Sequence, residues 1–259
     1  MNIDKKYYQE INENLTNTIQ DTNISAPNKK VGKVRDAYFL NDKVVMISTD
    51  RQSAFDRVLA AIPYKGAVLN SVSAWWFKKT EHLFPNHLIS TPDPNVSIVE
   101  KCTVFPVEFV VRGYITGTTD TSLWTVYNNG DREYCGNSLP EGLKKNDKLD
   151  KPMLTPTTKD KVHDRPVSRE EIIDLGLMSA EDYDLAAKMS LDLFAFGQET
   201  AKRNGLILVD TKYEIGTDSK GKIKFVDEIH TPDSSRFWIS TSYKERIDSG
   251  QEPENIDKE

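Results

Sequence analysis

The residues with the clearest chemical potential lie in the stretch LILVDTKYEIG, near the C-terminal end of the sequence. Leu208, Asp210, Lys212 and Glu214 alternate with residues of apolar or neutral character, so a β-strand would place these four on one face. Carboxylates and an ammonium group on one strand face suit a metal-bound anion better than they suit a packed core. The alternative is a solvated sheet face with cross-strand ion pairs, and the pattern alone fits both interpretations equally.

A second strand is predicted over residues 223–229, after a turn rich in glycine, aspartate and serine. If Glu214 pairs with Ile223, Asp227 lies on the charged side of the hairpin, and if the pairing slips by one residue, Glu228 does so instead. In either register a carboxylate from the second strand joins those of the first. Mg²⁺ fits such a set, because it takes one or two carboxylates and completes its shell with phosphate oxygens.

Further clusters place cations or polar groups beside glycines or at strand ends. They are Lys33 and Arg35 in GKVRD, Asp50, Arg51 and Ser53 after an apolar strand, Arg112 before the turn at Gly117 and Thr118, and Asp233 and Arg236 in PDSSR. Each also has an ordinary interpretation, as a surface hairpin, a polar strand end, a glycine turn or a polar loop. There is no Walker loop, zinc spacing or Ser-His-Asp order. Together the clusters favour the binding of anions, and with it phosphoryl chemistry or ATP-driven ligation.

The composition is that of a soluble globular protein: 259 residues, 37% hydrophobic and 29% charged. That length allows one large domain or two lobes. The net charge of −6 and the lack of a basic run argue against nucleic-acid binding. Cys102 and Cys135 fit packed thiols in a reducing compartment. The sequence shows neither a signal core nor an apolar run of membrane-spanning length, so we expect a cytoplasmic protein that binds no membrane.

The elements expected to position these clusters are strands first and helices late, which indicates an α+β fold. Helices are predicted over residues 4–20 and 66–83, a hairpin over 28–50, strands over 96–102 and 107–112 that are separated at Pro106, and a long surface loop over 136–166. Two further helices begin at the capping boxes of Ser168 and Ser179 and end near Gly176 and Gly205.

Six segments carry a resemblance to a known family: GKVRDAY, STDRQSAFD, PVEFVVRGYITGTTDTSLWTVYNNG, LTPTTK, LILVDTKYEIG and VDEIHTPDSSRFW. On these residues the sequence resembles the SAICAR synthetase family, in its longer, yeast-type branch. The resemblance implies an α+β fold with an antiparallel N-terminal sheet lobe (residues 1–103), a larger C-terminal α+β lobe (104–259) and ATP between them. It also implies a monomeric ATP-dependent carbon–nitrogen ligase of purine biosynthesis. That enzyme joins L-aspartate to carboxyaminoimidazole ribonucleotide (CAIR) and gives SAICAR, ADP and phosphate.

The resemblance also assigns roles to single residues. For the nucleotide and its Mg²⁺ it implies Lys33 and Arg35 at the phosphates, Lys101 beside adenine, and Glu214 and Asp227 as metal ligands. For the ribotide it implies Arg112, Thr118 and Arg236 at the phosphate, and Asp210, Lys212 and Asp233 at the imidazole and carboxylate, with Asp210, Lys212 and Arg236 as the catalytic set. For aspartate or substrate positioning it implies Asp50, Arg51 and Ser53, with Lys159 and His163 on a loop that closes over the substrates.

Two other functions remain open at this point. A kinase-like phosphotransferase would use the same ATP and Mg²⁺ groups, and a non-catalytic nucleotide-binding module would bind ATP without turnover. Longer members of the family continue past a PENIDKE-like segment into another apolar helix, whereas this sequence ends at Glu259. If the chain has been shortened there, we expect an apolar groove to be left uncovered.

Overall fold

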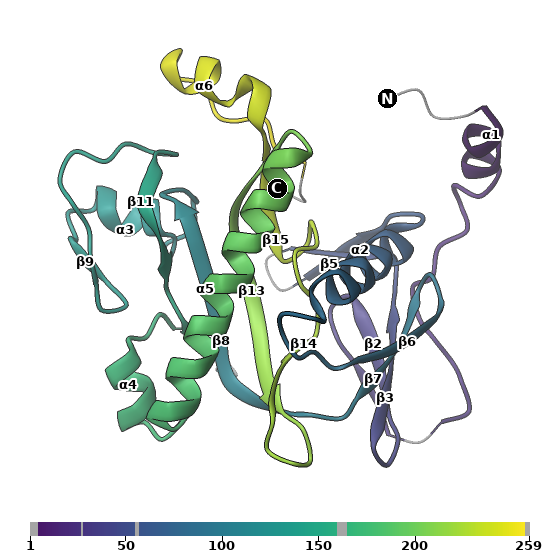
Figure 1. The fold of residues 1–259 in the computed structure, drawn as a ribbon. Coiled ribbons are helices and arrows are strands. Elements are labelled where there is room, and N and C mark those ends of the chain that lie inside the picture. The colour runs from purple at the N-terminus through teal and green to yellow at the C-terminus, as the bar shows by residue number, and fades with distance from the viewer. Residues whose placement is uncertain (1–4, 27, 55–56, 160–164, 257–259) are drawn as a thin grey trace. The chain divides into compact units, whose positions relative to one another are not determined.

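The computed structural model describes residues 5–26, 28–54, 57–159 and 165–256 and is shown in Figure 1. The chain forms two compact units: Met1–Lys78 with His87–Lys101, and Lys79–Asn86 with Cys102–Glu259. The division into lobes of residues 1–103 and 104–259 stays a prediction. In the described part of the chain, no helix is long and apolar enough to cross a membrane.

The first unit is built on an antiparallel sheet with the strand order β1-β2-β3-β7-β6. Its strands are β1 (Lys29–Val31), β2 (Arg35–Phe39), β3 (Lys43–Ser48), β6 (Leu88–Asp93) and β7 (Val96–Glu100). The predicted hairpin over residues 28–50 is therefore three strands, because a turn at Gly32 divides its first arm. The predicted turn at residues 41–42 is confirmed, since Leu40 N–H donates to Lys43 O at 2.9 Å.

Three more elements complete the first unit: α1 (Lys5–Glu13), the ribbon of β4 (Arg51–Ala54) and β5 (Arg57–Ala61), and α2 (Lys65–Thr80). The helix α2 is tied to the sheet because Asn70 donates to Pro94 O at 2.9 Å and accepts from Ser97 at 2.7 Å. The helix predicted over residues 4–20 is shorter than expected. The helix ends at Glu13, and the Ile19 N–H group, which was expected in its last turn, instead donates to Asp50 Oδ2 at 2.8 Å.

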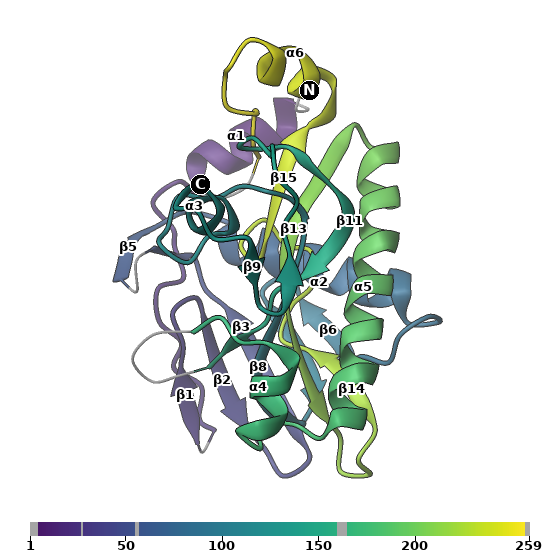
Figure 2. The ribbon, with the colours of Figure 1, turned by 90° about the vertical axis from the view of Figure 1, so that its left-hand side faces the viewer.

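The second unit is built on two long antiparallel strands, β8 (Thr103–Tyr114) and β13 (Leu206–Thr217). Around them lie β11 (Lys148–Leu154), β12 (Thr157–Thr158), β14 (Ile223–Val226) and β15 (Ser235–Ile239), with β11 and β12 on β8 and β14 and β15 on β13. The helix α5 (Ala180–Arg203) runs along β8 and β13 in both ribbon views (Figures 1 and 2). The ring centroids of Phe109 on β8 and Tyr183 on α5 lie 5.7 Å apart, and both side chains are buried.

The smaller elements of the second unit are α3 (Leu123–Asn128), β9 (Glu133–Tyr134), β10 (Asn137–Ser138), α4 (Arg169–Asp174) and α6 (Ser240–Asp248). The predicted capping box of Ser168 is confirmed, since its hydroxyl accepts from Glu171 N–H and the Glu171 carboxylate accepts from Ser168 N–H. The second helix start is confirmed as well, because the Ser179 hydroxyl accepts from Asp182 N–H.

Two expectations about this unit were wrong. Pro106 does not separate two strands but lies inside β8, where the register against β13 shifts between Glu108 and Val104. An irregularity of this kind tolerates a residue without an N–H group. Residues 136–166 are not simply a loop, since they include β10, β11 and β12. β11 lies at the edge of its sheet with mostly exposed side chains, so its polar sequence did not show the pattern of a buried strand.

Candidate active site on the charged face of the central sheet

One face of β8 and β13 carries charged side chains, and we call it the charged face: Glu108, Arg112, Asp210, Lys212 and Glu214. Alternation along both strands turns Phe109 and Tyr213, which are paired with each other, towards α5, and so turns these five residues to the other side. The pairs Arg112–Asp210 and Glu108–Glu214 lie directly opposite each other across the two strands. The charged groups are therefore aligned by main-chain hydrogen bonds rather than by flexible loops.

Leu208 does not belong to this face, although the alternation predicted that it would. The register between β13 and β15 shifts between Leu208 and Asp210, so the alternation is broken there. The Leu208 side chain lies against α5, where an added Cβ at Gly197 would be 2.8 Å from its Cδ2 atom. Leu208 is thus a core residue, and the charged face begins at Asp210.

Lys212 joins two opposed carboxylates on the charged face. Its Nζ lies 2.9 Å from Glu108 Oε1 and 2.9 Å from Glu214 Oε1. Burial would lower the pKa of Lys212, but the negative charges of Glu214, Glu108 and Asp227 outweigh burial and raise it. Lys212 is therefore a fixed cation throughout the physiological pH range.

Glu214 has a second cationic partner, because Lys159, which follows β12, also donates to its carboxylate. Burial would raise the pKa of Glu214, but the charges and hydrogen bonds of Lys212 and Lys159 outweigh burial and lower it. The carboxylate is therefore ionised at neutral pH, as a cation ligand must be.

Two guanidinium groups contact the Asp210 carboxylate at the other end of the charged face. Its Oδ2 atom accepts from Arg236 Nη1 at 2.7 Å and lies 3.5 Å from Arg112 Nη1. Arg112 is held further by Thr155, whose hydroxyl accepts from Nε at 2.9 Å. Two guanidinium groups on one carboxylate leave an excess of positive charge, and such a group attracts a phosphate or a carboxylate.

In the hairpin of β13 and β14, neither Asp227 nor Glu228 reaches the charged face as part of the second strand, as the two predicted registers required. Glu214 pairs with Val226, a register that would bring Glu228 to the charged face if the strand continued. The strand instead ends at Val226, and Asp227 has a φ of 63°, which turns the chain out of the sheet. Glu228 is buried and accepts a hydrogen bond from the Thr231 hydroxyl at 2.7 Å, while the charge of Asp227 acts on Lys212.

The loop of residues 227–234 is anchored by the buried His230. The imidazole hydrogen-bonds the Tyr213 hydroxyl and lies against Gly197 of α5, and its backbone has a φ of 52°. Burial lowers the pKa of His230 to about 3, so the ring is neutral at pH 7. Asp233 lies in the same loop, where its N–H group donates to the Thr231 hydroxyl at 3.3 Å.

The remaining residues proposed from the sequence are not on β8 or β13. Thr118 is exposed in the loop after β8. The others belong to the first unit: Lys33 in the turn after β1, Arg35 at the start of β2, Lys101 after β7, and Asp50, Arg51 and Ser53 in and beside β4, where all three are buried. His163 lies outside the described residues.

Sequence reasoning missed Glu108 and Thr155. Glu108 and Arg112 stand four residues apart in one strand, so the alternation of VEFVVR could have placed both on one face. The spacing could not show that Glu108 lies opposite Glu214, because that depends on the register between strands distant in sequence. Thr155 gave no signal of its own, since its role is to support the Arg112 side chain.

The donor set of this face fits a magnesium ion that shares its shell with a substrate. Glu214 is ionised, Asp227 adds a second carboxylate nearby, and the described residues include no group of three or more His, Cys, Asp or Glu that could hold a metal ion by itself. Mg²⁺ takes few carboxylates and completes its shell with phosphate oxygens and water, so such a site suits a phosphate-bearing ligand. A cation at Glu214 would compete with the ammonium group of Lys159.

Solved structures with the same fold define the class of protein. SAICAR synthase from Saccharomyces cerevisiae, complexed with SAICAR, matches with a TM-score of 0.77 at 33% identity, over 87% of this chain and 81% of that chain. A type-2 SAICAR synthetase in complex with ADP matches with a TM-score of 0.70 at 26% identity, over 86% of this chain and 92% of that one. The fold is thus that of SAICAR synthases, and the class is an ATP-dependent ligase of α+β architecture.

The sequence comparisons make the assignment specific. The family model for SAICAR synthetase matches residues 28–259. The phosphoribosylaminoimidazole-succinocarboxamide synthase of Legionella pneumophila (strain Lens) is 59% identical over 241 residues, which are 93% of this chain and 77% of the relative. The chloroplastic enzyme of Vigna aconitifolia is 56% identical over 250 residues, which are 95% of this chain and 73% of the relative. The chain belongs to the SAICAR synthetase family.

Proposed function

We propose that the charged face is the place where this ligase joins L-aspartate to CAIR, with ATP as the source of the driving force. The observation that carries the proposal is the paired arrangement on β8 and β13: a guanidinium pair on Asp210 at one end, and Lys212 between Glu108 and Glu214 at the other. The first group suits a phosphate, and the second suits a reacting carboxylate beside a metal-bound nucleotide.

The chemistry explains why both groups are needed. A carboxylate is a poor electrophile, since its charge repels nucleophiles and oxide is a poor leaving group. Transfer of the ATP γ-phosphoryl group to a carboxylate oxygen of CAIR would give ADP and an acyl phosphate. The aspartate amine would then attack the carbonyl carbon, form the C–N bond, release phosphate and give up a proton. The reactants are all anions, so fixed cations must offset their repulsion.

In this scheme Asp210 orients Arg112 and Arg236 towards the ribotide phosphate, and Lys212 lies beside the CAIR carboxylate. Glu214 and Asp227 would hold Mg²⁺, which when bound offsets negative charge on the transferring phosphoryl group. Lys159 would close towards the substrates, which excludes water from an acyl phosphate. The other assignments are Thr118 at the ribotide phosphate, Asp233 at the imidazole, Lys33 and Arg35 at the nucleotide phosphates, Lys101 beside adenine, and Asp50 and Ser53 near aspartate.

The proposal is tested by measuring ADP release with and without L-aspartate in the presence of CAIR, ATP and Mg²⁺. We expect release that depends on aspartate, whereas phosphorylation of CAIR that does not would favour a kinase-like phosphotransferase. Asp227→Asn should abolish Mg²⁺-dependent turnover with little change in folding. Asp192→Asn on the exposed side of α5 is a matched control, because its carboxylate forms a surface ion pair with Lys188. Full activity of Asp227→Asn would remove Asp227 from the metal site.

We also propose that the enzyme acts in the cytoplasm as a monomer and that Mg²⁺ is its metal. The small-molecule substrates account for the charged groups described above, so the proposal includes neither a nucleic-acid nor a membrane partner. Sedimentation of the purified protein and activity measured with Mg²⁺, with Ca²⁺ and with a chelator test the last two points directly.

A further inference from the structure

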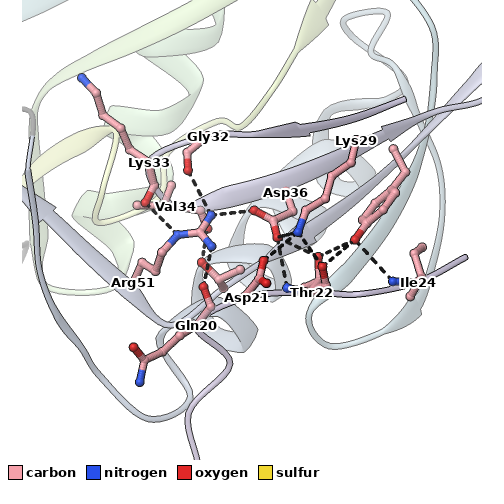
Figure 3. Close-up of polar contacts among 12 residues, drawn as sticks. Gln20, Asp21, Thr22, Ile24, Lys29, Gly32, Lys33, Val34, Asp36 and Arg51 are labelled. Atoms are coloured by element: carbon pink, nitrogen blue, oxygen red, sulfur yellow. Dashed lines mark hydrogen bonds and ion pairs between the residues drawn. The ribbon is translucent and has the colours of Figure 1, made fainter. Parts of the chain in front are cut away.

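Arg51 is buried, and its guanidinium group donates to main-chain carbonyls rather than pointing into solvent (Figure 3). Nε donates to Lys33 O at 3.1 Å, and Nη2 donates to Gly32 O at 3.0 Å. Nη1 donates to Gln20 O at 2.6 Å, and Nη2 also reaches Asp36 Oδ1 at 2.7 Å. Each of these contacts is internal to the first unit, so the guanidinium serves the protein's own backbone.

The third carbonyl of the same turn has donors of its own. Val34 O accepts from Thr49 N–H at 2.9 Å and from the Thr49 hydroxyl at 2.8 Å. Successive carbonyl groups of residues 32, 33 and 34 are thus directed towards Arg51 and Thr49. Because no peptide bond in the described chain is cis, the N–H groups of Lys33, Val34 and Arg35 point to the opposite side of the turn.

The turn is also closed tightly. Gly32 N–H donates to Arg35 O at 2.8 Å, and a Cβ atom on Gly32 would lie only 2.9 Å from that oxygen. The Lys33 side chain extends away from the Arg51 guanidinium in Figure 3. Main-chain N–H groups directed to one side of a glycine turn that also carries a lysine form an arrangement that suits phosphate oxygens.

We propose that Arg51 is a positioning residue: it fixes the turn of residues 32–35 in the conformation that receives the nucleotide phosphates. The inference uses one part of the proposed function, namely that Lys33 and Arg35 bind the ATP phosphates. It replaces the direct substrate contact that the sequence suggested for Arg51.

An arginine is required here for a geometric reason. Its planar group presents donors from three nitrogens in different directions, whereas the ammonium group of a lysine is a single point of charge. Asp36, which is fully buried, holds the group in place and also accepts from Thr22 and lies 3.0 Å from Lys29 Nζ. Burial would raise the pKa of Asp36, but Thr22, Arg51 and Lys29 lower it, so the carboxylate stays charged at neutral pH.

Arg51→Lys is the direct test, because it keeps the charge and removes the fork of donors. We expect the KM for ATP and the Kd for ADP, measured by calorimetry, to rise about tenfold, which corresponds to about 1.4 kcal/mol. The kcat and the KM for aspartate should change less than about twofold, since no other substrate contact is altered. Arg132→Lys is the matched control: this partly exposed arginine also donates to two carbonyls, of Tyr127 and Asp131, and pairs with Glu141.

A double-mutant cycle separates positioning from a general loss of structure. If Arg51 acts through the turn, Lys33→Ala should weaken ADP binding less in the Arg51→Lys background than in the wild type. Additive effects, or an unchanged Kd for ADP in Arg51→Lys, would overturn the inference. If Arg51→Lys does not fold, Thr49→Val removes one donor to Val34 O at nearly constant volume, and it should still raise the Kd for ADP several-fold.

Calorimetry with ADP alone keeps this test independent of turnover. A wild-type protein that binds ADP without aspartate-dependent ADP release would contradict the proposed function and leave the Arg51 inference fully testable. A wild-type protein that does not bind ADP would contradict both.

Discussion

Gly197 of α5 lies against Leu208 of β13 and against His230, and Gly197→Ala is therefore a severe test of the packing described above. A Cβ atom added there would lie 2.4 Å from His230 Cε1, 3.0 Å from His230 Nδ1 and 2.8 Å from Leu208 Cδ2. Ordinary contacts between carbon atoms are about 3.5–4.0 Å. Both neighbours are 1% exposed, so neither has open space to move into.

The expected magnitude follows from two opposed terms. Overpacking a well-filled core costs about 1–3 kcal/mol and occasionally more, and the shortest of these contacts would place this site at the upper end. Alanine is better than glycine inside a helix by about 1 kcal/mol, which offsets part of the cost. The net result is a loss of about 2 kcal/mol, or a Tm lower by roughly 4–8 °C for a protein of this size.

Urea unfolding and thermal melts measure this loss. Gly205→Ala is the comparison, because its φ is 73° and nothing lies within 4 Å of the added Cβ atom, so it reports backbone strain without a clash. His230 anchors the loop that carries Asp227 and Asp233. Gly197→Ala should therefore also lower the kcat measured at temperatures well below the Tm of the variant, whereas Gly205→Ala should leave kcat unchanged. A Gly197→Ala protein as stable as the wild type would show that α5 does not pack on the sheet as described.

Three other outcomes follow from the structure. The pKa of His230 is lowered from 6.5 to about 3, so between these pH values the imidazole is protonated in the unfolded chain but not in the folded one. The free energy of unfolding should therefore fall as the pH is lowered from 6.5 to 3, by up to about 1.4 kcal/mol per pH unit. Urea titrations of the wild type and His230→Gln at pH 7 and 5 measure this loss, and an equal loss in the two proteins would contradict it. Ser168→Ala should lower the free energy of unfolding by about 1 kcal/mol through loss of its capping box, as measured in thermal melts. An unchanged Tm would show that the capping box does not stabilise the protein. Lys212→Met should lower ligase activity at least about 100-fold, because Glu108 and Glu214 would face each other without the cation between them; circular dichroism should show a retained fold.

The local features of this chain could be predicted from the sequence because they depend on neighbouring residues. The apolar run of β3, the alternation that sets Asp210, Lys212 and Glu214 on one face, and the two serine caps are all read within about ten residues. The sequence therefore determined where the main strands and capped helices lie and which charges share a strand.

Register and edge positions could not be predicted in this way, since they depend on strands that are distant in sequence. Glu108 lies opposite Glu214 only because β8 pairs with β13 in one of several possible registers. Pro106 stays inside β8 because the register shifts beside it, and β11 is a strand in spite of its polar sequence because it needs to bury few side chains at a sheet edge.

The contacts of the Arg51 guanidinium group likewise could not be predicted from the local sequence. The sequence placed an arginine just after an apolar strand, which is typical of both a ligand contact and an internal support. Only the folded first unit brings the carbonyls of Gly32 and Lys33 and the carboxylate of Asp36 around its guanidinium. The sequence by itself determined the family, the strands and the charges that share a face, because periodicity and motifs are local. The tertiary structure decided which of those charges meet and which arginine supports the backbone, because buried polar groups take the partners that the packed chain brings to them.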